Sequence, residues 1–302
     1  MARSSPIVID TISSIRAWRA IQSQQGRRVA LVPTMGALHE GHLQLVKEAA
    51  SRCDSVVVSI FVNPAQFAPH EDLDQYPRTL QSDLEALQEC EKVEAVFVPK
   101  VSEMYPKGIV LEVENQVGAF VEVKGRSHQM EGKSRPTFFR GVATVVSKLF
   151  NIVLPDVVIF GQKDAQQCVV IRTLIDDLHF PIEMIVCSTM REQDGLAMSS
   201  RNRYLTPHQR TIATSLYSAL SAAKELYLQG KRNRDELMAI AHQVFEERIA
   251  GEEGVKLDYI SLANPRTLEE LQTVGKEGAI LSGAFWVGKA RLIDNLLLDC
   301  EL

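Results

Sequence analysis

Two histidines stand three residues apart in segment 32–42, where an apolar run gives way to an amphipathic one. Residues 28–32 predict a buried strand of a parallel sheet, and the apolar spacing from Leu43 onward predicts a helix. The start of a helix offers backbone N–H groups and the positive end of the helix dipole, which favour a bound phosphate. Imidazoles there can stabilise charge that develops at phosphorus. With Gly36 and Gly41 permitting close approach, the segment predicts a nucleotide site. The competing interpretation is one core and one surface histidine.

A second polar segment follows the apolar run 56–62. Asn63 and Gln66 each carry amide donors and an acceptor, which suit a substrate hydroxyl or carboxylate. The alternative is ordinary turn chemistry, because Asn-Pro is a common start of a turn.

A third segment, residues 160–167, has the same strand–loop–helix pattern. Asp164 is placed to cap the following helix, and Lys163 would bring a point charge beside the phosphates. Gln167 could face the same cavity as Gln66. A solvated lysine is the competing interpretation.

A polar loop at residues 191–203 combines arginines, serines and a glycine. Such side chains suit polyphosphate oxygens, and a mobile loop of this kind can close over a nucleotide and exclude water. Taken alone, the same loop could be an interdomain linker.

Two further groups of residues have weaker functional interpretations. Three valines at helical spacing are explained most simply as core, although one end of the stripe could wall an apolar pocket. Three scattered acids are interpreted mainly as surface charge with weak magnesium potential. The valines are Val142, Val145 and Val146, and the acids are Asp72, Asp74 and Asp83.

Alternating strand and helix patterns must position these loops. The predicted strands are 29–32, 56–62, 95–98, 157–160 and 182–187, with a further strand at Ile7, and the predicted helices are 43–52, 80–91, 139–151 and 164–178. This alternation predicts an α/β fold, a Rossmann-like parallel sheet covered by helices on both faces. Ligands bind such sheets beyond the carboxyl ends of the strands, so we expect the three loops to converge on one edge.

Two regions depart from that rhythm. Within residues 104–132, the alternating pieces 110–113 and 120–123 predict an inserted β-ribbon punctuated by glycines. After Cys187, helices at 207–229 and 232–249 and strands at 256–262, 279–287 and 292–298 predict a smaller α+β domain with an antiparallel sheet. We therefore expect domains at 1–187 and 188–302.

The composition is that of an ordinary globular protein of 302 residues, with a formal net charge of -5. This charge argues against broad binding to nucleic acids or anionic membranes, and no apolar run is long enough to cross a bilayer. The first apolar stretch is too short for a signal peptide. Five scattered cysteines without a CxxC pair favour reduced thiols and a cytoplasmic location.

Taken together, these segments resemble the pantothenate synthetase family, the AMP-forming pantoate–β-alanine ligases. The resemblance runs through residues 32–42, 59–67, 76–78, 103–106, 141–153, 161–167, 191–202 and 291–295. The His-x-Gly-His element by itself is shared with the wider superfamily of HIGH-motif nucleotidyl transferases and class I aminoacyl-tRNA synthetases. Residues 198–201 resemble the second, mobile ATP-binding signature of that superfamily.

The resemblance implies a two-step reaction of small molecules. Pantoate attacks the α-phosphorus of ATP to give pantoyl adenylate and pyrophosphate, and the amine of β-alanine then displaces AMP. It further implies a homodimer, Mg²⁺ bound through ATP phosphates with no protein metal site, and an ATP- and pantoate-binding first domain with a C-terminal lid domain.

The resemblance also implies the following residue roles at matching positions. His42, as the expected proton donor, acts with His39, Lys163 and Arg201 in catalysis. Gln66 and Gln167 hold pantoate beside Asn63, Gln66 also meets β-alanine, and Val142, Val145 and Val146 pack against the dimethyl group. Asp164 lies near the ribose, and Met190 touches adenine through its backbone. The full ATP-binding set is Met35, Gly36, Ala37, Leu38, His39, Glu40, Gly41, His42, Gly161, Gln162, Lys163, Asp164, Met190, Met198, Ser199, Ser200 and Arg201.

The chain departs from the family pattern at three places. Residues 135–139 read Arg-Pro-Thr-Phe-Phe where relatives commonly have Arg-Pro-Gly-His-Phe, so a histidine contribution is absent. The acidic pair of some members is Ser82-Asp83, which puts a protein-bound magnesium in doubt, and Met190 replaces the usual valine. Two alternatives remain: another HIGH-motif nucleotidyl transferase, which the paired glutamines and the valines disfavour, and a non-catalytic nucleotide-binding protein, which the intact motifs disfavour.

Overall fold

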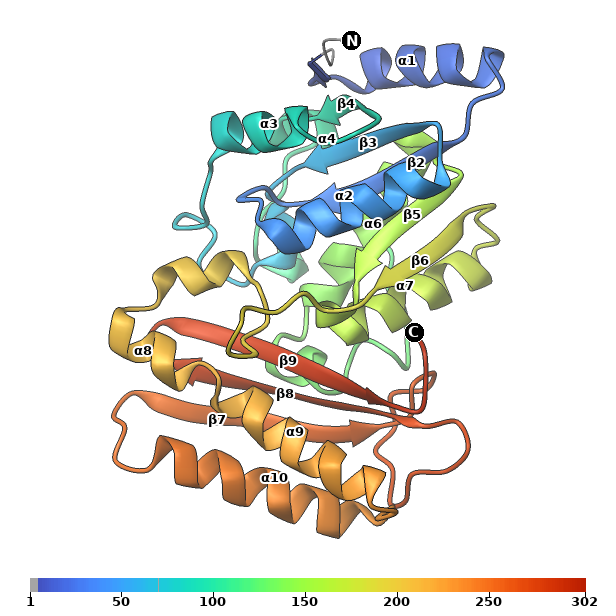
Figure 1. Cartoon of the computed structure of the whole chain (residues 1–302). Coiled ribbons are helices and arrows are strands. Elements are labelled where there is room, and N and C mark those ends of the chain that lie inside the picture. Colours follow the sequence, from blue (N-terminus) through green and yellow to red (C-terminus); the bar gives the residue numbers. More distant parts are fainter. Residues whose placement is uncertain (1–4, 70) are drawn as a thin grey trace. The chain divides into compact units, whose positions relative to one another are not determined.

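The computed structural model describes residues 5–69 and 71–302 (Figure 1). The chain forms two compact units. The first comprises residues up to 127 together with 135–161 and 170–187, and the second comprises 128–134, 162–169 and 188–302. Each unit has its own sheet.

The sheet of the first unit has six parallel strands in the order β1-β4-β3-β2-β5-β6. The strands are β1 (Ile7–Ile9), β2 (Val29–Thr34), β3 (Ser55–Ile60), β4 (Val93–Phe97), β5 (Val157–Gly161) and β6 (Glu183–Cys187). The central strands are buried along most of their length, as expected for continuous apolar runs in a parallel sheet. The predicted parallel α/β sheet is confirmed.

The strand order reverses beside β2. From β2 the chain continues to β3 and β4 on one side, and it then returns to β5 and β6 on the other. Such a reversal creates a crevice outside the carboxyl ends of the strands, where open α/β sheets bind ligands. The predicted site loops after β2, β3 and β5 therefore leave neighbouring strands at the same edge.

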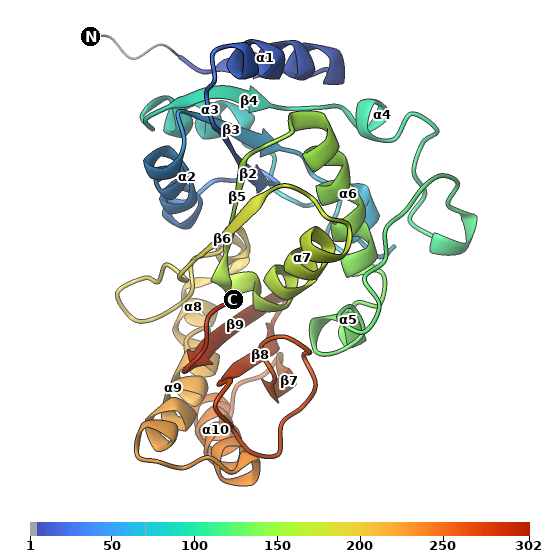
Figure 2. The ribbon, with the colours of Figure 1, turned by 90° about the vertical axis from the view of Figure 1, so that its right-hand side faces the viewer.

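Helices cover both faces of this sheet (Figure 2). Apolar residues of α2 (Glu40–Arg52) and α3 (Leu80–Gln88) share one buried cluster with the central strands. The long, almost wholly apolar α6 (Phe138–Val153) packs against β2 on the other face, beside α1 (Ile12–Gln24). The short α4 (Val101–Met104) and α7 (Ala165–Asp177), which belongs to this unit from Val170 onward, complete the helices.

The β-ribbon predicted within residues 104–132 is wrong. The structure has instead a 3-10 turn, η2 (Val113–Asn115), and a one-turn helix, α5 (Glu131–Ser134), joined by irregular chain. The backbone N–H of Val121 donates to the hydroxyl of Thr144 on α6 and not to a neighbouring strand, at 2.9 Å. A short alternating pattern therefore formed no ladder, because a side chain on a helix satisfied the backbone instead.

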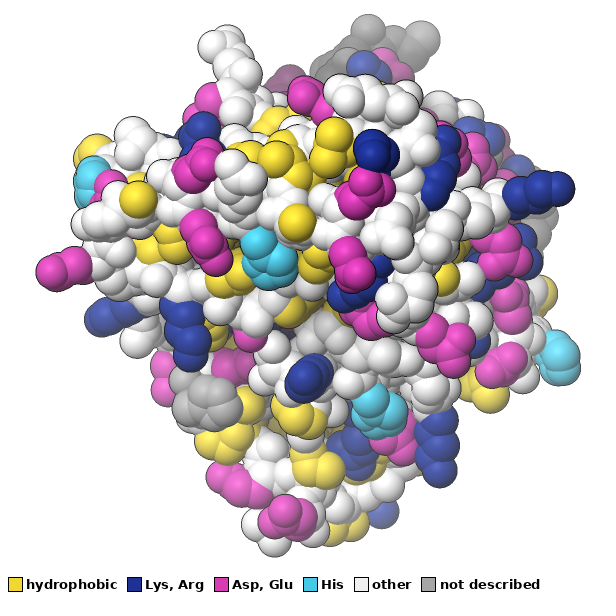
Figure 3. Space-filling model, turned by 90° about the horizontal axis from the view of Figure 1, so that it is seen from below, with side chains coloured by type: hydrophobic (Ala, Val, Ile, Leu, Met, Phe, Trp, Pro, Cys, Tyr) yellow, Lys and Arg dark blue, Asp and Glu magenta, His cyan; other side chains and the backbone are white. Residues whose placement is uncertain are grey.

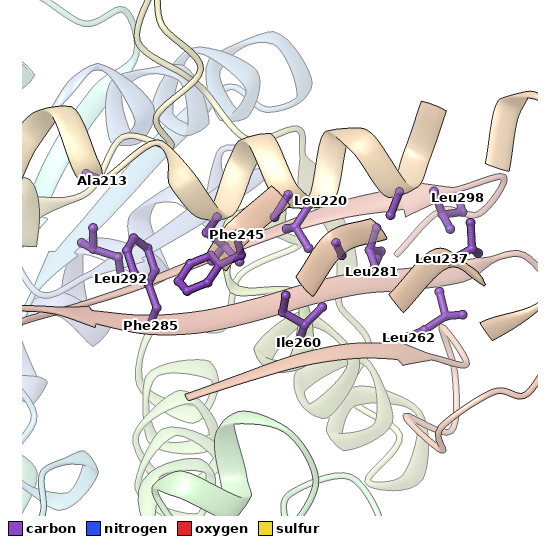
Figure 4. Packing of buried hydrophobic residues seen from close by; sticks show 14 of the residues in the cluster. Ala213, Leu220, Leu237, Phe245, Ile260, Leu262, Leu281, Phe285, Leu292 and Leu298 are labelled. Atoms are coloured by element: carbon purple, nitrogen blue, oxygen red, sulfur yellow. The ribbon is translucent and has the colours of Figure 1, made fainter. Parts of the chain in front are cut away.

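The second unit packs helices on a three-stranded antiparallel sheet, which confirms that prediction. The strands β7 (Val255–Ala263), β8 (Ala279–Val287) and β9 (Ala290–Leu298) lie in chain order. Buried residues of α9 (Ser215–Leu228) and α10 (Arg234–Ile249) fill one side of the sheet (Figure 4). Phe245 and Phe285 meet edge to face at 5.3 Å, the geometry that aromatic quadrupoles favour.

One continuous helix over residues 207–229 was predicted, and this is wrong. The chain forms α8 (Pro207–Ile212) and α9, which are separated at residues 213–214. The hydroxyl of Thr214 bonds the carbonyl of Thr211 and accepts from Arg248 at 2.9 Å. Local hydrogen bonding by a threonine side chain competes with the regular helical ladder.

The surface carries charges of both signs. On the face shown in Figure 3, acidic and basic side chains are interspersed with apolar ones. Among the residues that the structure describes, no helix combines the length and apolar character needed to span a bilayer.

Candidate active site

The loop between β2 and α2 is held in an unusual backbone conformation. Gly36 and Ala37 both have positive φ, +82° and 51°. A side chain at Gly36 would also bring its Cβ to 3.0 Å from Ile60 and 3.1 Å from Asp83. A side chain at Gly36 would therefore strain the backbone and would require Ile60 and Asp83 to shift by a few tenths of an ångström.

The two histidines form the cap of α2. Nδ1 of His39 accepts the backbone N–H of Gly41 at 3.1 Å, and Nδ1 of His42 accepts the N–H of His39 at 3.4 Å. The rings lie 4.1 Å apart between centroids. Because each Nδ1 is an acceptor, the neutral form of each ring carries its proton on Nε2. Helix α2 begins at Glu40 and not at Leu43, so both imidazoles belong to the helix start itself.

Asp83 on α3 fixes this loop by accepting hydrogen bonds from its backbone. Its carboxylate is 2% exposed and accepts the N–H of Ala37 at 3.0 Å and that of Leu38 at 2.8 Å. The hydroxyl of Thr79 adds a third hydrogen bond at 3.2 Å. The prediction of surface charge is wrong for Asp83, because the buried amides of the loop need an acceptor that the strand cannot supply. Asp74 is exposed as predicted, whereas Asp72 is half-buried.

The expectation of free backbone N–H groups at this junction is also wrong for most of the loop. Besides the amides of Ala37 and Leu38, the N–H of Gly36 donates to the Thr34 hydroxyl at 3.2 Å. Those of His39 and Gly41 are taken by the imidazoles. The amides of this loop therefore maintain its shape.

The loop after β3 places a buried pair of amides beside the first loop. Asn63 is 1% exposed, and its Nδ2 donates to Oε1 of Gln66 at 3.1 Å and to the carbonyl of Gly141 at 3.2 Å. Nε2 of Gln66 lies 3.0 Å from the sulfur of Met35. Tyr105 donates its hydroxyl to Oδ1 of Asn63 at 2.7 Å. Burial raises the pKa of Tyr105 far above its ordinary value, so this donor stays protonated.

An arginine from the divergent segment 135–139 braces the same loop. Arg135 forms two 2.6 Å hydrogen bonds to the carboxylate of Glu71 and one of 3.1 Å to the carbonyl of Gln66. Its guanidinium lies 3.9 Å from the ring centre of Phe138. A bidentate, stacked pair of this kind orients backbone strongly. The segment therefore has a structural role in this chain.

Helix α6 comes very close to this loop. A Cβ added at Gly141 would lie 2.1 Å from the carbonyl oxygen of Ala65, so only glycine allows the contact. The next turns bury Val142, Val145 and Val146. Their burial is compatible with core packing and with a pocket wall.

In the second unit, an asparagine on β9 holds the 162–164 turn. Asn295 is 1% exposed; its Nδ2 donates to the carbonyls of Gln162 at 2.8 Å and Lys163 at 2.9 Å, and its Oδ1 accepts from the Gln162 side chain at 3.0 Å. Residues Gln162–Asp164 form the 3-10 turn η3 directly before α7. The ammonium of Lys163 lies 3.8 Å from the carboxylate of Asp164.

The 191–203 loop is anchored at its root. Arg191 makes a bidentate pair with Asp294 at 2.6 and 2.8 Å and also donates to the carbonyls of Gly195 and Asn295. The oxygen of Ser199 accepts the N–H of Arg201 at 3.3 Å and begins the 3-10 turn η4 (Ser200–Tyr204). The loop is therefore a structured element and not a loose linker.

The remaining predicted residues have varied surroundings. The carbonyl of Met190 accepts the N–H of Met198 at 2.9 Å, and the Met190 side chain is exposed. Gln167 is half-buried on α7, Ser200 is buried and Glu40 is exposed. Gly161 ends β5 in the first unit.

Four residues shape these loops in ways that the sequence did not predict: Asp83, Tyr105, Asp294 and Asn295. Each lies in a segment that carried the resemblance or, for Asp83, beside one. Their partners, however, are backbone groups and side chains distant in sequence, which no local pattern reveals. Among the described residues there is also no group of three or more His, Cys, Asp and Glu side chains able to hold a metal ion.

The parallel sheet with its switch point, together with the histidine-capped helix after β2, defines an α/β nucleotide-using enzyme of the HIGH-motif nucleotidyl transferase type.

Comparison with known proteins identifies the family. The profile of the pantoate-beta-alanine ligase family matches residues 7–297. The pantothenate synthetase of Chloroflexus aggregans is 49% identical over 291 residues, which are 96% of this chain and 99% of that protein. A crystal structure of pantoate-beta-alanine ligase (pantothenate synthetase) from Thermus thermophilus superposes with a TM-score of 0.85 at 41% identity, covering 96% and 98% of the two chains.

A pantoate-beta-alanine ligase from Francisella tularensis, complexed with beta-gamma ATP and beta-alanine, superposes with a TM-score of 0.75 at 35% identity over 97% of each chain. The chain belongs to the pantoate–β-alanine ligase family. It is an enzyme that condenses pantoate with β-alanine at the expense of ATP.

Proposed function

We propose that the condensation proceeds through pantoyl adenylate. A carboxylate oxygen of (R)-pantoate attacks the α-phosphorus of ATP, and the bond to the bridging oxygen of pyrophosphate breaks. The amine of β-alanine then attacks the acyl carbon, loses a proton and expels AMP. Adenylation converts a carboxylate oxygen, which is a poor leaving group, into a good one.

The imidazoles stabilise the first step. The observation that carries this assignment is the histidine cap of α2, in which the Nδ1 atoms of His39 and His42 are occupied by backbone N–H groups. These contacts fix the orientation of both rings, and we assign to the rings the stabilisation of charge that develops on the phosphate oxygens. His42 is the proton donor, and residues 35–41 line the nucleotide. Since the loop amides are already bonded, its shape is set before ATP arrives.

Pantoate lies against the second loop. Gln66 and Gln167 hydrogen-bond its oxygens, and Gln66 also meets β-alanine. The buried valines of α6 pack on the dimethyl group. We revise the role of Asn63: both ends of its amide are engaged within the protein, so it supports Gln66.

Residues 161–164 and 190–201 supply the other nucleotide contacts in this proposal. Lys163 and Arg201 place positive charge on the phosphates, and Ser199 and Ser200 donate hydroxyl hydrogen bonds. Gly161, Gln162 and Asp164 complete the site near the ribose, while Met198 and the backbone of Met190 border adenine. The anchors at Asp294 and Asn295 support this assignment, because they hold both contributing loops on one strand.

Mg²⁺ bound through the ATP phosphates would neutralise part of their charge. A protein-bound ion at the acidic position of relatives does not fit this chain, because both oxygens of Asp83 accept protein donors. We also propose a cytoplasmic homodimer with an ATP- and pantoate-binding domain at 1–187 and a lid domain at 188–302. Light scattering of the purified protein tests its dimeric state.

An omission experiment tests the reaction. AMP release requires ATP, pantoate and β-alanine together, whereas pyrophosphate release in a single turnover requires only ATP and pantoate. AMP release without β-alanine, or pyrophosphate release without pantoate, contradicts the proposed sequence. A nucleotidyl transferase would release pyrophosphate and retain the nucleotide in its product without forming AMP.

A further inference from the structure

Behind Gln66 lies a hydrogen-bonded series of polar side chains that is closed off from solvent. It runs from the hydroxyl of Tyr105 through the amide of Asn63 to the amide of Gln66, with hydrogen bonds of 2.7 and 3.1 Å. All three side chains are at most 8% exposed. In such surroundings each polar atom needs a partner, because a buried donor or acceptor without one is costly.

One backbone carbonyl fixes which way the amide of Asn63 is turned, and with it the direction of the hydrogen bonds in this series. The oxygen of Gly141 can only accept, so the Asn63 atom that faces it at 3.2 Å must be the amide nitrogen. The oxygen end of Asn63 then faces Tyr105, whose hydroxyl donates. With Asn63 reversed, two oxygens would oppose each other at Gly141.

Gly141 and Tyr105, which set the orientation of Asn63, are themselves held in place. Gly141 packs on the backbone of Ala65 and donates its own N–H to Thr137 at 3.1 Å within α6. The ring of Tyr105 lies beneath Lys148, whose ammonium is 3.6 Å from the ring centroid and donates to the carbonyl of Met104 at 2.7 Å. Neither Gly141 nor Tyr105 can turn without breaking these contacts.

The orientation passes to Gln66. The second N–H of Asn63 donates to Oε1 of Gln66, so the carbonyl end of Gln66 faces the protein. Its nitrogen faces outward from this pair and meets the thioether of Met35 at 3.0 Å. Sulfur is a weak acceptor, so a substrate oxygen can displace this contact at little cost.

We infer that Asn63 and Tyr105 are positioning residues that make Gln66 present its amide nitrogen, so that Gln66 recognises an acceptor oxygen of pantoate as a hydrogen-bond donor. This inference rests on the proposed placement of pantoate at Gln66. It assigns polarity to the contact and gives Tyr105 a role.

The first test exchanges the presented atom. Gln66→Glu retains the shape and an oxygen for Asn63, but places a carboxylate oxygen where the N–H₂ group was. We expect kcat/KM for pantoate to fall at least as far as in Gln66→Ala, about 10- to 100-fold for the loss of a hydrogen bond to a charged group, with the KM for ATP within about twofold. Near-normal kcat/KM in Gln66→Glu overturns the inference.

The second test removes the hydroxyl of Tyr105, at the far end of the hydrogen-bonded series. In Tyr105→Phe the oxygen of Asn63 loses its buried donor, and we expect the KM for pantoate to rise about tenfold while the KM for ATP changes little. Tyr227→Phe is the matched control, because it removes a buried hydroxyl bonded to Asp299 at 2.8 Å in the second unit. An unchanged pantoate KM in Tyr105→Phe, or an equal rise in both variants, contradicts the positioning role.

The wild-type enzyme separates the two hypotheses. If it releases no AMP in response to pantoate, the proposed function fails. If it does so normally while the Gln66 and Tyr105 variants behave like wild type, only the polarity inference fails.

Discussion

Replacing Asp83 by asparagine removes one acceptor from the loop that carries the histidines and changes little else in shape. The carboxylate takes three donors, from Ala37, Leu38 and Thr79, at 3.0, 2.8 and 3.2 Å. Whichever way the new amide is turned, its nitrogen faces a backbone N–H.

The cost follows from these contacts. One buried N–H is left without a partner, which costs about 1–3 kcal/mol, and the surviving bonds lose their charged acceptor, which costs roughly 1 kcal/mol more. We therefore expect the free energy of unfolding of the first unit to fall by about 2–4 kcal/mol. Because His39 follows Leu38 directly, a displaced loop should also lower kcat/KM for ATP by about 10- to 100-fold.

Urea unfolding monitored by fluorescence measures the first effect. The chain has two tryptophans, Trp18 in α1 and the exposed Trp286 on β8. In a Trp286→Phe background the emission reports the first unit alone. A coupled AMP-release assay with varied ATP measures the second effect.

Asp74→Asn is the matched control, since Asp74 is an exposed acid in the preceding segment. We expect it to change stability by no more than about 0.5 kcal/mol. If Asp83→Asn is as stable and as active as Asp74→Asn, the buried carboxylate does not hold the loop and the reasoning is refuted.

Three further outcomes are expected. His39→Asn and His42→Gln keep capping side chains and should remain folded in circular dichroism, but they should slow pyrophosphate release by about 100-fold or more; near-normal release at saturating ATP and pantoate contradicts the phosphate role. Gly141→Ala forces a Cβ against the Ala65 carbonyl and should lower the unfolding midpoint and weaken pantoate, whereas an unchanged midpoint would mean that α6 can shift freely. Burial raises the pKa of the Cys187 thiol to about 11, so alkylation by iodoacetamide at pH 8, followed by peptide mass spectrometry, should be far slower in the native protein than in urea; equal rates would show that the thiol is accessible.

Much of the first unit could be predicted because its pattern is local. Continuous apolar runs such as β3 and β5 suit only strands buried on both faces, and the alternation with helices then dictates a parallel sheet. The β-ribbon failed for the opposite reason. Alternation over a few residues gives a strand only where a partner strand is available, and the Val121 amide found a threonine on α6 instead.

The candidate site likewise has a part that the sequence could predict and a part that it could not. The sequence alone determined which residue types stand at the ends of β2, β3 and β5, because strand ends and helix starts follow from hydrophobic periodicity. It therefore indicated the histidines, Gln66 and Lys163 as candidate site residues. Only the tertiary structure decided what holds them, since Asp83, Tyr105 and Asn295 act across long sequence separations and satisfy backbone and amide groups that burial would otherwise leave unpaired. Residue type is a local property of the chain, whereas the orientation of an imidazole or an amide is set by partners that only folding brings within reach.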